Sequence, residues 1–291
     1  MTLAKAGHVS VDGARLGYRV EGEGRAVLIP GSHLLSPRTF SKRFRATHRC
    51  VFADHRAFVP GAAAPSGRPF GLAEAVEDVE AVRRHLSLDR IVLAGHSMFG
   101  HLALAYAVAY PDVVDGVVLI GIGPRASGVE AAVEAHWESE ASDDRKRAWR
   151  DDRERVAREL EIGEWSSRDR LLHEMLSADR ARRSFDLDRD ETAFWAGVDL
   201  EMAMFGSYLE HGAGAYDLTS GPKIETPVLV AAGRFDFVAP PVLWDDAAVE
   251  RLRQATFVTF GFSGHTPQSE EPDAFDATFD DWLSRVGLEY R

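Results

Sequence analysis

The fold of this 291-residue chain is decided by the stretch Val92-Leu93-Ala94-Gly95-His96-Ser97-Met98-Phe99-Gly100. An apolar run enters this stretch, and a helix-like run over residues 102–110 leaves it. Gly95 has no Cβ, so strand and helix can approach closely at the turn. The pattern predicts a strand, a sharp turn and a helix, with the Ser97 hydroxyl above a sheet and the first N–H groups of the helix unpaired beside it.

A serine at such a turn, a nucleophile elbow, is suited to attack a carbonyl carbon. The tripeptide Gly-x-Ser alone is a weak signal, since many loops carry it. Ser97 could also be an ordinary helix N-cap. A hydroxyl is a poor nucleophile at neutral pH, so catalysis needs a base and a carboxylate that orients the base.

Two later loops offer these groups. Asp236 comes just after the buried run 227–233, and His265 follows the β-branched and aromatic run 255–260. Loops that follow parallel strands meet at the carboxyl edge of the sheet, where ligands bind. We therefore expect Ser97, Asp236 and His265 to converge. The simpler alternatives are a turn former for Asp236 and a solvated bystander for His265.

An oxyanion site needs two backbone donors. The N–H of Met98 follows the nucleophile directly, and the second donor is expected in the loop after an early strand. Residues 26–29 have the apolar pattern of that strand, and the loop begins Pro30-Gly31-Ser32-His33. The main-chain N–H of Ser32 is the predicted second donor.

The order Ser97, Asp236, His265 resembles the α/β-hydrolase fold serine hydrolases over residues 8–123 and 220–291. This resemblance implies an α/β fold: a mostly parallel twisted sheet with helices on both faces and an inserted helical cap. The implied core is 1–123 and 222–291, and the implied cap is 124–221.

Two segments are most similar to the proline iminopeptidase group: Gly233-Arg234-Phe235-Asp236 followed by Pro240-Pro241, and Gly264-His265 followed by Glu271-Pro272. In that group, acidic cap residues hold the free amino terminus of the substrate. The resemblance makes Glu201 and Glu210 candidates for this role, with plain surface charge as the alternative.

The chain departs from the family pattern at three places. Pro30 stands where a histidine usually precedes Gly31, and Phe99 replaces the second elbow glycine. Ala57 replaces the glycine of an Asp-x-Arg-Gly loop. A phenylalanine ring at a crowded turn requires smaller neighbours or a shifted helix, so the departures predict a reshaped pocket.

Elsewhere the pattern predicts a hairpin of residues 8–11 and 16–20 around Asp12-Gly13, and a helix over 72–86. Further strands are expected at 26–30, 50–54, 91–95 and 116–121. The alternation of strand and helix lapses after residue 124 and resumes near 222. The segment between is densely charged and carries four tryptophans, which either pack the cap onto the core or line an apolar chamber: Trp137, Trp149, Trp165 and Trp195.

The net charge of −12 argues against nucleic acid or an anionic membrane surface as partner. Cys50, the single cysteine, is expected in a buried strand and cannot form an intrachain disulfide. The start of the chain lacks the apolar region of a signal peptide, and no run is long enough to span a membrane, so a cytoplasmic protein is expected. No metal motif or phosphate-binding pattern occurs, and we expect no cofactor.

Together these features predict a serine hydrolase that cleaves a small ester or amide through an acyl-enzyme. An amine leaving group would make it an aminopeptidase, as the resemblance to the proline iminopeptidase group implies. An alcohol leaving group would make it an esterase or lactonase. A hydrolase-fold protein that senses a ligand or catalyses a non-hydrolytic reaction is the alternative of a different class. The sequence leaves the substrate and the oligomeric state open.

Overall fold

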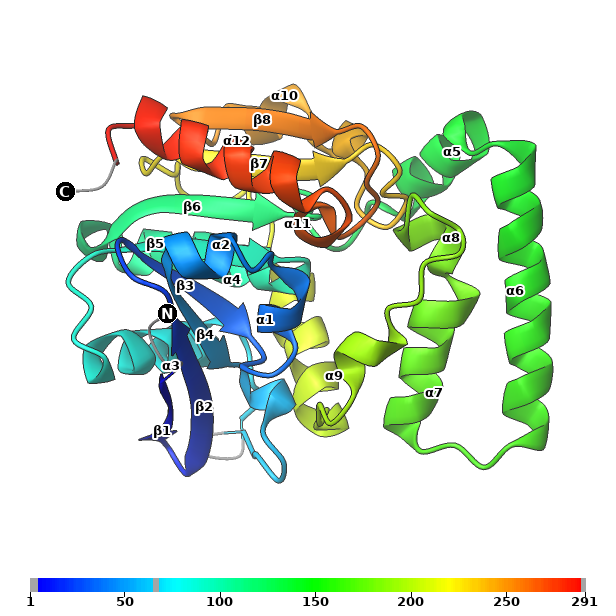
Figure 1. Cartoon of the computed structure of the whole chain (residues 1–291), viewed down its shortest axis with the longest axis horizontal. Helices are drawn as coiled ribbons and strands as arrows, with labels where there is room; N and C mark the ends of the chain where they lie inside the picture. The colour runs from blue at the N-terminus through cyan, green and yellow to red at the C-terminus, as the bar shows by residue number, and fades with distance from the viewer. Residues whose placement is uncertain (1–4, 65–67, 289–291) are drawn as a thin grey trace.

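The computed structural model describes residues 5–64 and 68–288, which contain an eight-stranded sheet in the order β1-β2-β4-β3-β5-β6-β7-β8 (Figure 1). β2 pairs antiparallel with β1 and β4, and the remaining pairs are parallel. The strands are β1 (Lys5–Val11), β2 (Ala14–Glu21), β3 (Ala26–Gly31), β4 (Arg49–Asp54), β5 (Ile91–His96), β6 (Val114–Ile120), β7 (Val228–Gly233) and β8 (Ala255–Phe260). The predicted strands are confirmed to within about two residues at most ends, and β1 extends three residues further toward the N-terminus.

The first hairpin shows why the local sequence folds as it does. β1 and β2 join through Asp12 and Gly13, which have φ of 43° and 80°. Two positive φ angles are what a tight two-residue hairpin requires, and Asp-Gly adopts them readily. Cys50 lies fully buried in β4 as a free thiol, as expected.

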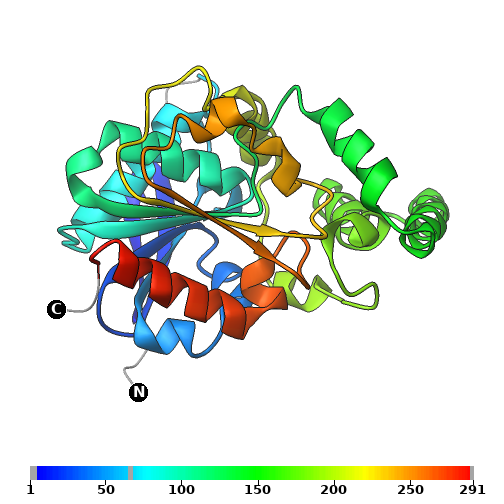
Figure 2. The same ribbon diagram turned by 90° about the horizontal axis from the view of Figure 1, so that it is seen from above.

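Helices cover both faces of the sheet (Figure 2). On one face α3 (Leu72–His85) and α4 (Met98–Ala109) pack their apolar sides against the strands. On the other face lie α1 (Ser36–Thr39), α2 (Phe44–Thr47), α11 (Pro267–Glu270) and α12 (Pro272–Arg285), with Phe44, Phe279 and Trp282 buried between α2, α12 and the sheet. The predicted helix over 72–86 is confirmed, and the predicted fold class is correct.

Between β6 and β7 the chain forms helices without a strand of the main sheet. They are α5 (Glu130–Glu140), α6 (Asp143–Ile162), α7 (Ser167–His173), η4 (Glu174–Ala178), α8 (Arg180–Arg183), η5 (Thr192–Trp195), α9 (Met202–His211) and η6 (Ala213–Ala215). We call residues 124–221 the inserted segment. Its helices lie beyond the carboxyl ends of the parallel strands, with α6 outermost (Figure 1). Its status as a separate cap domain stays a prediction.

The tryptophans of the inserted segment have divided roles. Trp137 is buried against Phe237 and Trp149, and the Arg182 guanidinium lies over both indole rings. Trp165 is 38% exposed and stacks on His173. Packing thus accounts for Trp137 and Trp149, whereas Trp195 lines the cavity described below. None of the helices within residues 5–64 and 68–288 is both long enough and apolar enough to cross a bilayer.

Candidate active site

Ser97 lies at the sharp turn between β5 and α4, with φ 54° and ψ −133°. A non-glycine residue in this region is strained by about 1–3 kcal/mol. The turn is tight, because a Cβ on Gly95 would lie 2.2 Å from the Phe99 carbonyl oxygen. Ser97 occupies the N-cap position of α4 but makes no capping hydrogen bond. The N-cap alternative therefore does not explain this serine.

The structure brings Ser97, His265 and Asp236 into one hydrogen-bonded chain. Ser97 Oγ is 3.0 Å from His265 Nε2, and His265 Nδ1 is 2.9 Å from Asp236 Oδ2. With Nδ1 donating to the carboxylate, Nε2 of the neutral imidazole is the acceptor for the serine hydroxyl. Asp236 and His265 are almost completely buried, at 0% and 1% exposure, so little water competes for these bonds.

The other carboxylate oxygen of Asp236 accepts hydrogen bonds from the backbone N–H groups of Val238 and Ala239, both at 2.9 Å. Asp236 is thus also the turn former that the sequence allowed. Burial by itself raises the pKa of this carboxyl, but the His265 imidazole and the two backbone donors outweigh burial and hold the pKa below its ordinary value of 3.8. The carboxylate is therefore ionised at neutral pH.

The loop that carries His265 is fixed by carboxylates. Glu270 Oε1 accepts from the backbone N–H groups of Gly264 and Thr266, on either side of the histidine. Glu271 accepts from the N–H of Phe262. These bonds satisfy backbone donors on both sides of the histidine, and they hold the imidazole in place.

Helix α8 of the inserted segment contacts both loops of this chain. The Arg183 carbonyl accepts the His265 N–H at 2.6 Å, and the Arg182 carbonyl accepts the Phe237 N–H at 2.9 Å. Gly264 makes this approach possible, since a Cβ there would lie 2.1 Å from the Arg183 carbonyl oxygen. The last turn of α8 is therefore part of the support of the site.

His96, the residue before the serine, is a supporting group as well. Its Nε2 lies 2.9 Å from the His265 carbonyl oxygen, so this nitrogen carries the proton. Burial, with the neighbouring His265 and Arg183 adding to it, lowers the pKa of His96 to about 3. His96 is neutral at physiological pH, lines the cavity, and holds the backbone of His265 through this hydrogen bond.

The two predicted oxyanion donors lie at the same cavity as Ser97. The Met98 N–H belongs to the first residue of α4, where no intrahelical acceptor exists. The Ser32 N–H donates to Ser36 Oγ at a long 3.3 Å, while Ser32 Oγ accepts from the N–H groups of Leu34 and Leu35. Ser36 Oγ therefore accepts the Ser32 hydrogen bond that a ligand oxygen would otherwise accept.

The cavity beside Ser97 has a volume of about 240 Å³ and mostly apolar walls. Its lining includes Phe58, Phe99, Met175, Leu176, Phe194 and Trp195. Two charged side chains, Arg183 and Glu191, also line it, and both come from the inserted segment. A small, largely apolar ligand fits such a chamber.

Phe99 resolves its crowding by facing this cavity. Its ring stacks at 6.2 Å on Tyr208 and lies edge-on to His55 at 5.2 Å. A Cβ on Gly31 would lie 3.7 Å from the ring, which is ordinary van der Waals contact. The reshaping of the pocket relative to the family stays a prediction. In the altered Asp-x-Arg loop, Arg56 is buried and pairs with Asp78 at 2.7 Å.

Neither acidic candidate of the inserted segment lines the cavity. Glu201 accepts a hydrogen bond from the Gly61 N–H at 3.1 Å, and the Glu210 side chain is 76% exposed beside His211. The sequence reasoning missed Arg183 and Glu191, which do line it. Arg183 stands in the run Arg180-Ala181-Arg182-Arg183, which has the composition of a solvated helix face, so no local signal distinguishes it.

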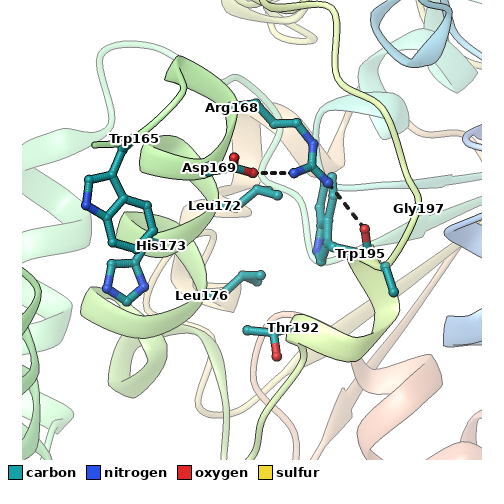
Figure 3. Close-up of a pocket in the computed structure, with 10 residues that line it drawn as sticks. Trp165, Arg168, Asp169, Leu172, His173, Leu176, Thr192, Trp195 and Gly197 are labelled. Atoms are coloured by element: carbon teal, nitrogen blue, oxygen red, sulfur yellow. Dashed lines mark hydrogen bonds and ion pairs between the residues drawn. The ribbon is translucent and has the colours of Figure 1, made fainter. Parts of the chain in front are cut away.

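A second hollow of about 390 Å³ lies within the inserted segment (Figure 3). Leu172 and Leu176 project toward Trp195 and Thr192, and the Arg168 guanidinium binds the Trp195 carbonyl at 3.3 Å. Leu176 and Trp195 line both hollows and so form the wall between them. Within the described residues, no group of three or more His, Cys, Asp or Glu side chains is placed to hold a metal ion.

Comparisons with known proteins agree with this architecture. The AB hydrolase superfamily protein YclE of Bacillus subtilis is 32% identical over 97% of this chain and 100% of its own length. A proline iminopeptidase-related protein from Thermus thermophilus superposes with a TM-score of 0.67 at 19% identity, covering 98% of this chain and 99% of its own. A thermophilic esterase from Thermogutta terrifontis superposes with a TM-score of 0.66 at 22% identity, covering 97% of this chain and 99% of its own. A family model of the alpha/beta hydrolase fold matches residues 29–272, and the chain therefore belongs to the α/β-hydrolase family.

Proposed function

We propose that this protein is a serine hydrolase that cleaves a small carboxylic ester or amide by two-step acyl transfer. The observation that carries the proposal is the chain of hydrogen bonds from Asp236 through His265 to Ser97, at 2.9 and 3.0 Å. The chain ends at a cavity whose walls are largely apolar. Structural alternatives for the three residues do not explain why all three point at one another.

In the proposed mechanism, His265 Nε2 takes the hydroxyl proton while Ser97 Oγ forms a bond to the carbonyl carbon. The resulting oxyanion accepts hydrogen bonds from the backbone N–H groups of Met98 and Ser32. For this, Ser32 must exchange its long 3.3 Å bond to Ser36 for one to the substrate. Collapse of the intermediate breaks the bond to the leaving group, which receives the proton from His265.

Water then repeats the attack on the acyl-enzyme. His265 accepts a proton from the water, the new oxyanion forms at the same two N–H groups, and Ser97 leaves with that proton as the acid product departs. The ionised Asp236 keeps the imidazole in the Nδ1-protonated tautomer and stabilises its positive charge in each step. Atoms and charges balance with water as the only co-reactant.

An ester or lactone is favoured over an aminopeptidase substrate. Recognition of a free amino terminus needs an available carboxylate in the cavity. Glu201 and Glu210 do not line it, and Glu191 is bound by Arg189 and Thr266. Among proteins of similar fold, one is an esterase and one is described as an N-acyl homoserine lactone degrading enzyme. These proteins resemble the chain in fold alone, so the preference for an ester or lactone rests on the chemistry of the cavity.

The decisive experiment labels the purified protein with a fluorophosphonate and compares it with Ser97→Ala. We expect covalent labelling of the unmodified protein and none of the variant. A parallel screen of aryl esters and aminoacyl anilides then separates esterase from peptidase. Absence of serine-dependent labelling would favour the ligand-sensing or non-hydrolytic alternative.

A further inference from the structure

We propose that Arg183 binds a carboxylate of the substrate, so that the protein acts on small amphipathic monoanions, an apolar chain with one acidic group. This inference deepens the proposed function, because it concerns the same cavity. It also stands on observations of its own, which concern the partners of this guanidinium.

Arg183 is one of the residues that line the cavity containing Ser97. Its Nε is buried and has no hydrogen-bond partner. Within residues 5–64 and 68–288 the guanidinium makes no ion pair either. An arginine cannot relieve this by losing its proton in any ordinary pH range. A buried cation without a partner is costly, and in native proteins such a cost is typical of a site that a ligand completes.

Arg145, a second buried arginine of the inserted segment, shows the usual solution. Its guanidinium donates to the carbonyl oxygens of Ala181, Ser184 and Phe185 at 2.6–2.7 Å. It is 6% exposed, and both of its terminal nitrogens have acceptors within the protein. The inserted segment can therefore bury an arginine with its partners, and at Arg183 those partners are missing.

The acidic side chains closest to Arg183 are already engaged. Glu191 pairs with Arg189 at 2.9 Å and accepts from the Thr266 hydroxyl at 3.1 Å. Asp236 is bound to His265 and to two backbone N–H groups. Asp179 accepts from the Trp149 indole N–H at 3.1 Å, and Glu270 accepts from backbone N–H groups of the histidine loop. All four carboxylates attract Arg183 at a distance, yet none forms an ion pair with it. The counter-ion of the guanidinium must come from a ligand.

A carboxylate is the anion that fits. The planar fork of a guanidinium matches a carboxylate in a bidentate pair, and the bond is strong where water is excluded. The other walls of the cavity are apolar, including Met175, Phe194 and Trp195. At about 240 Å³ the space suits a compact ligand, with its acidic end at Arg183 and its reactive carbonyl at Ser97.

Arg183 is also hydrogen-bonded through its backbone to His265, the proposed base. Its backbone carbonyl accepts the His265 N–H at 2.6 Å, so the residue that would bind the anion also holds the base. A ligand that fixes the guanidinium thereby fixes the end of α8 against the histidine loop. Anion binding is expected to order the site for attack as well as to add affinity.

The test measures binding without turnover. Monoethyl and diethyl esters of the straight-chain diacids from succinate to suberate differ within each pair by one ionised carboxylate. Isothermal titration of the full-length Ser97→Ala protein should give at least one monoester that binds ten-fold or more tightly than its diester. Adding Arg183→Gln should abolish this preference, and adding Arg183→Lys should retain part of it.

Arg180→Gln is the matched control, because Arg180 lies in the same helix but pairs with Asp152 at 2.8 Å and does not line the cavity. It should keep the preference for the monoester. Equal affinity for every monoester and its diester, or a preference that survives Arg183→Gln, would overturn the inference.

Turnover by the protein with an intact Ser97 separates this inference from the proposed function. Ethanol release from the same ester pairs should show a kcat/KM ratio that favours the monoester and falls toward one in Arg183→Gln. Hydrolysis with no such preference would leave the hydrolase intact and reject the role of Arg183. Preferential binding of monoesters without ethanol release would support the role of Arg183 and reject the proposed hydrolase activity.

Discussion

The sheet core and the inserted segment fix their cavity residues in different ways. In the core, Ser97, Asp236 and His265 each follow a parallel strand, so the sheet itself delivers them to one edge. In the inserted segment, Arg183 and Glu191 follow no strand, and their places depend on contacts such as the Arg183 carbonyl with the His265 N–H. The proposed reactive groups thus sit on the sheet core, and the proposed recognition groups sit on the part whose geometry is set by docking.

The largest effect should come from breaking the core chain at its carboxylate. Asp236→Asn should lower kcat by about ten-thousandfold, because the amide favours the wrong tautomer of His265. Asp217→Asn is the control, since Asp217 also accepts a backbone N–H two residues ahead, at 2.8 Å, but has no histidine partner. Steady-state kinetics measures kcat for both variants. Equal kcat values for Asp236→Asn and Asp217→Asn would mean that Asp236 only forms a turn.

A second comparison sets Arg145, which is buried with acceptors, against Arg183, whose buried Nε has no acceptor. Arg145→Met should lower the free energy of unfolding by about 2–4 kcal/mol, since it leaves buried carbonyl oxygens without donors. Arg183→Met should change it by less than about 1 kcal/mol, because an unpaired buried charge is removed. Urea unfolding measures both. A large loss in Arg183→Met would show that its guanidinium supports the fold.

The junction between the two regions can be disturbed with a single methyl group. Gly264→Ala should reduce kcat/KM by about ten- to a hundredfold, since a Cβ 2.1 Å from the Arg183 carbonyl oxygen must push α8 away from the histidine loop. Gly261→Ala, three residues earlier, meets nothing within 4 Å and should be nearly silent. Equal kinetics in the two variants would mean that the junction does not position His265.

The last prediction concerns acid stability, which changes gradually with pH and which we expect to originate in the core. His96 has a pKa near 3 in the folded state and 6.5 when unfolded, so the unfolded chain binds the extra proton between these values. Stability from this group is present above pH 6.5 and is lost as the pH falls toward 3. Between pH 3 and 6.5, His96→Gln should reduce the slope of the free energy of unfolding against pH by about 1.4 kcal/mol per pH unit. Unfolding midpoints at pH 4, 5, 6 and 7 provide the measurement, and an unchanged slope would contradict it.

The sequence alone determined the parts of this protein that depend on local rules. Strand lengths follow from buried apolar runs, the first turn follows from Asp12-Gly13, and the tight bend before Ser97 follows from Gly95. The meeting of Ser97, Asp236 and His265 could be predicted because parallel strands end at a common edge, which converts position along the chain into position in space.

Only the tertiary structure decided what surrounds them. The ring of Phe99 packs against Tyr208 and His55, which are distant in sequence. The place of Arg183 likewise depends on how α8 docks against two loops distant in sequence. A charged residue in a short helix has the same local pattern whether it faces solvent or a buried cavity. The difference lies in the contacts of the whole fold, and no periodicity in the chain encodes them.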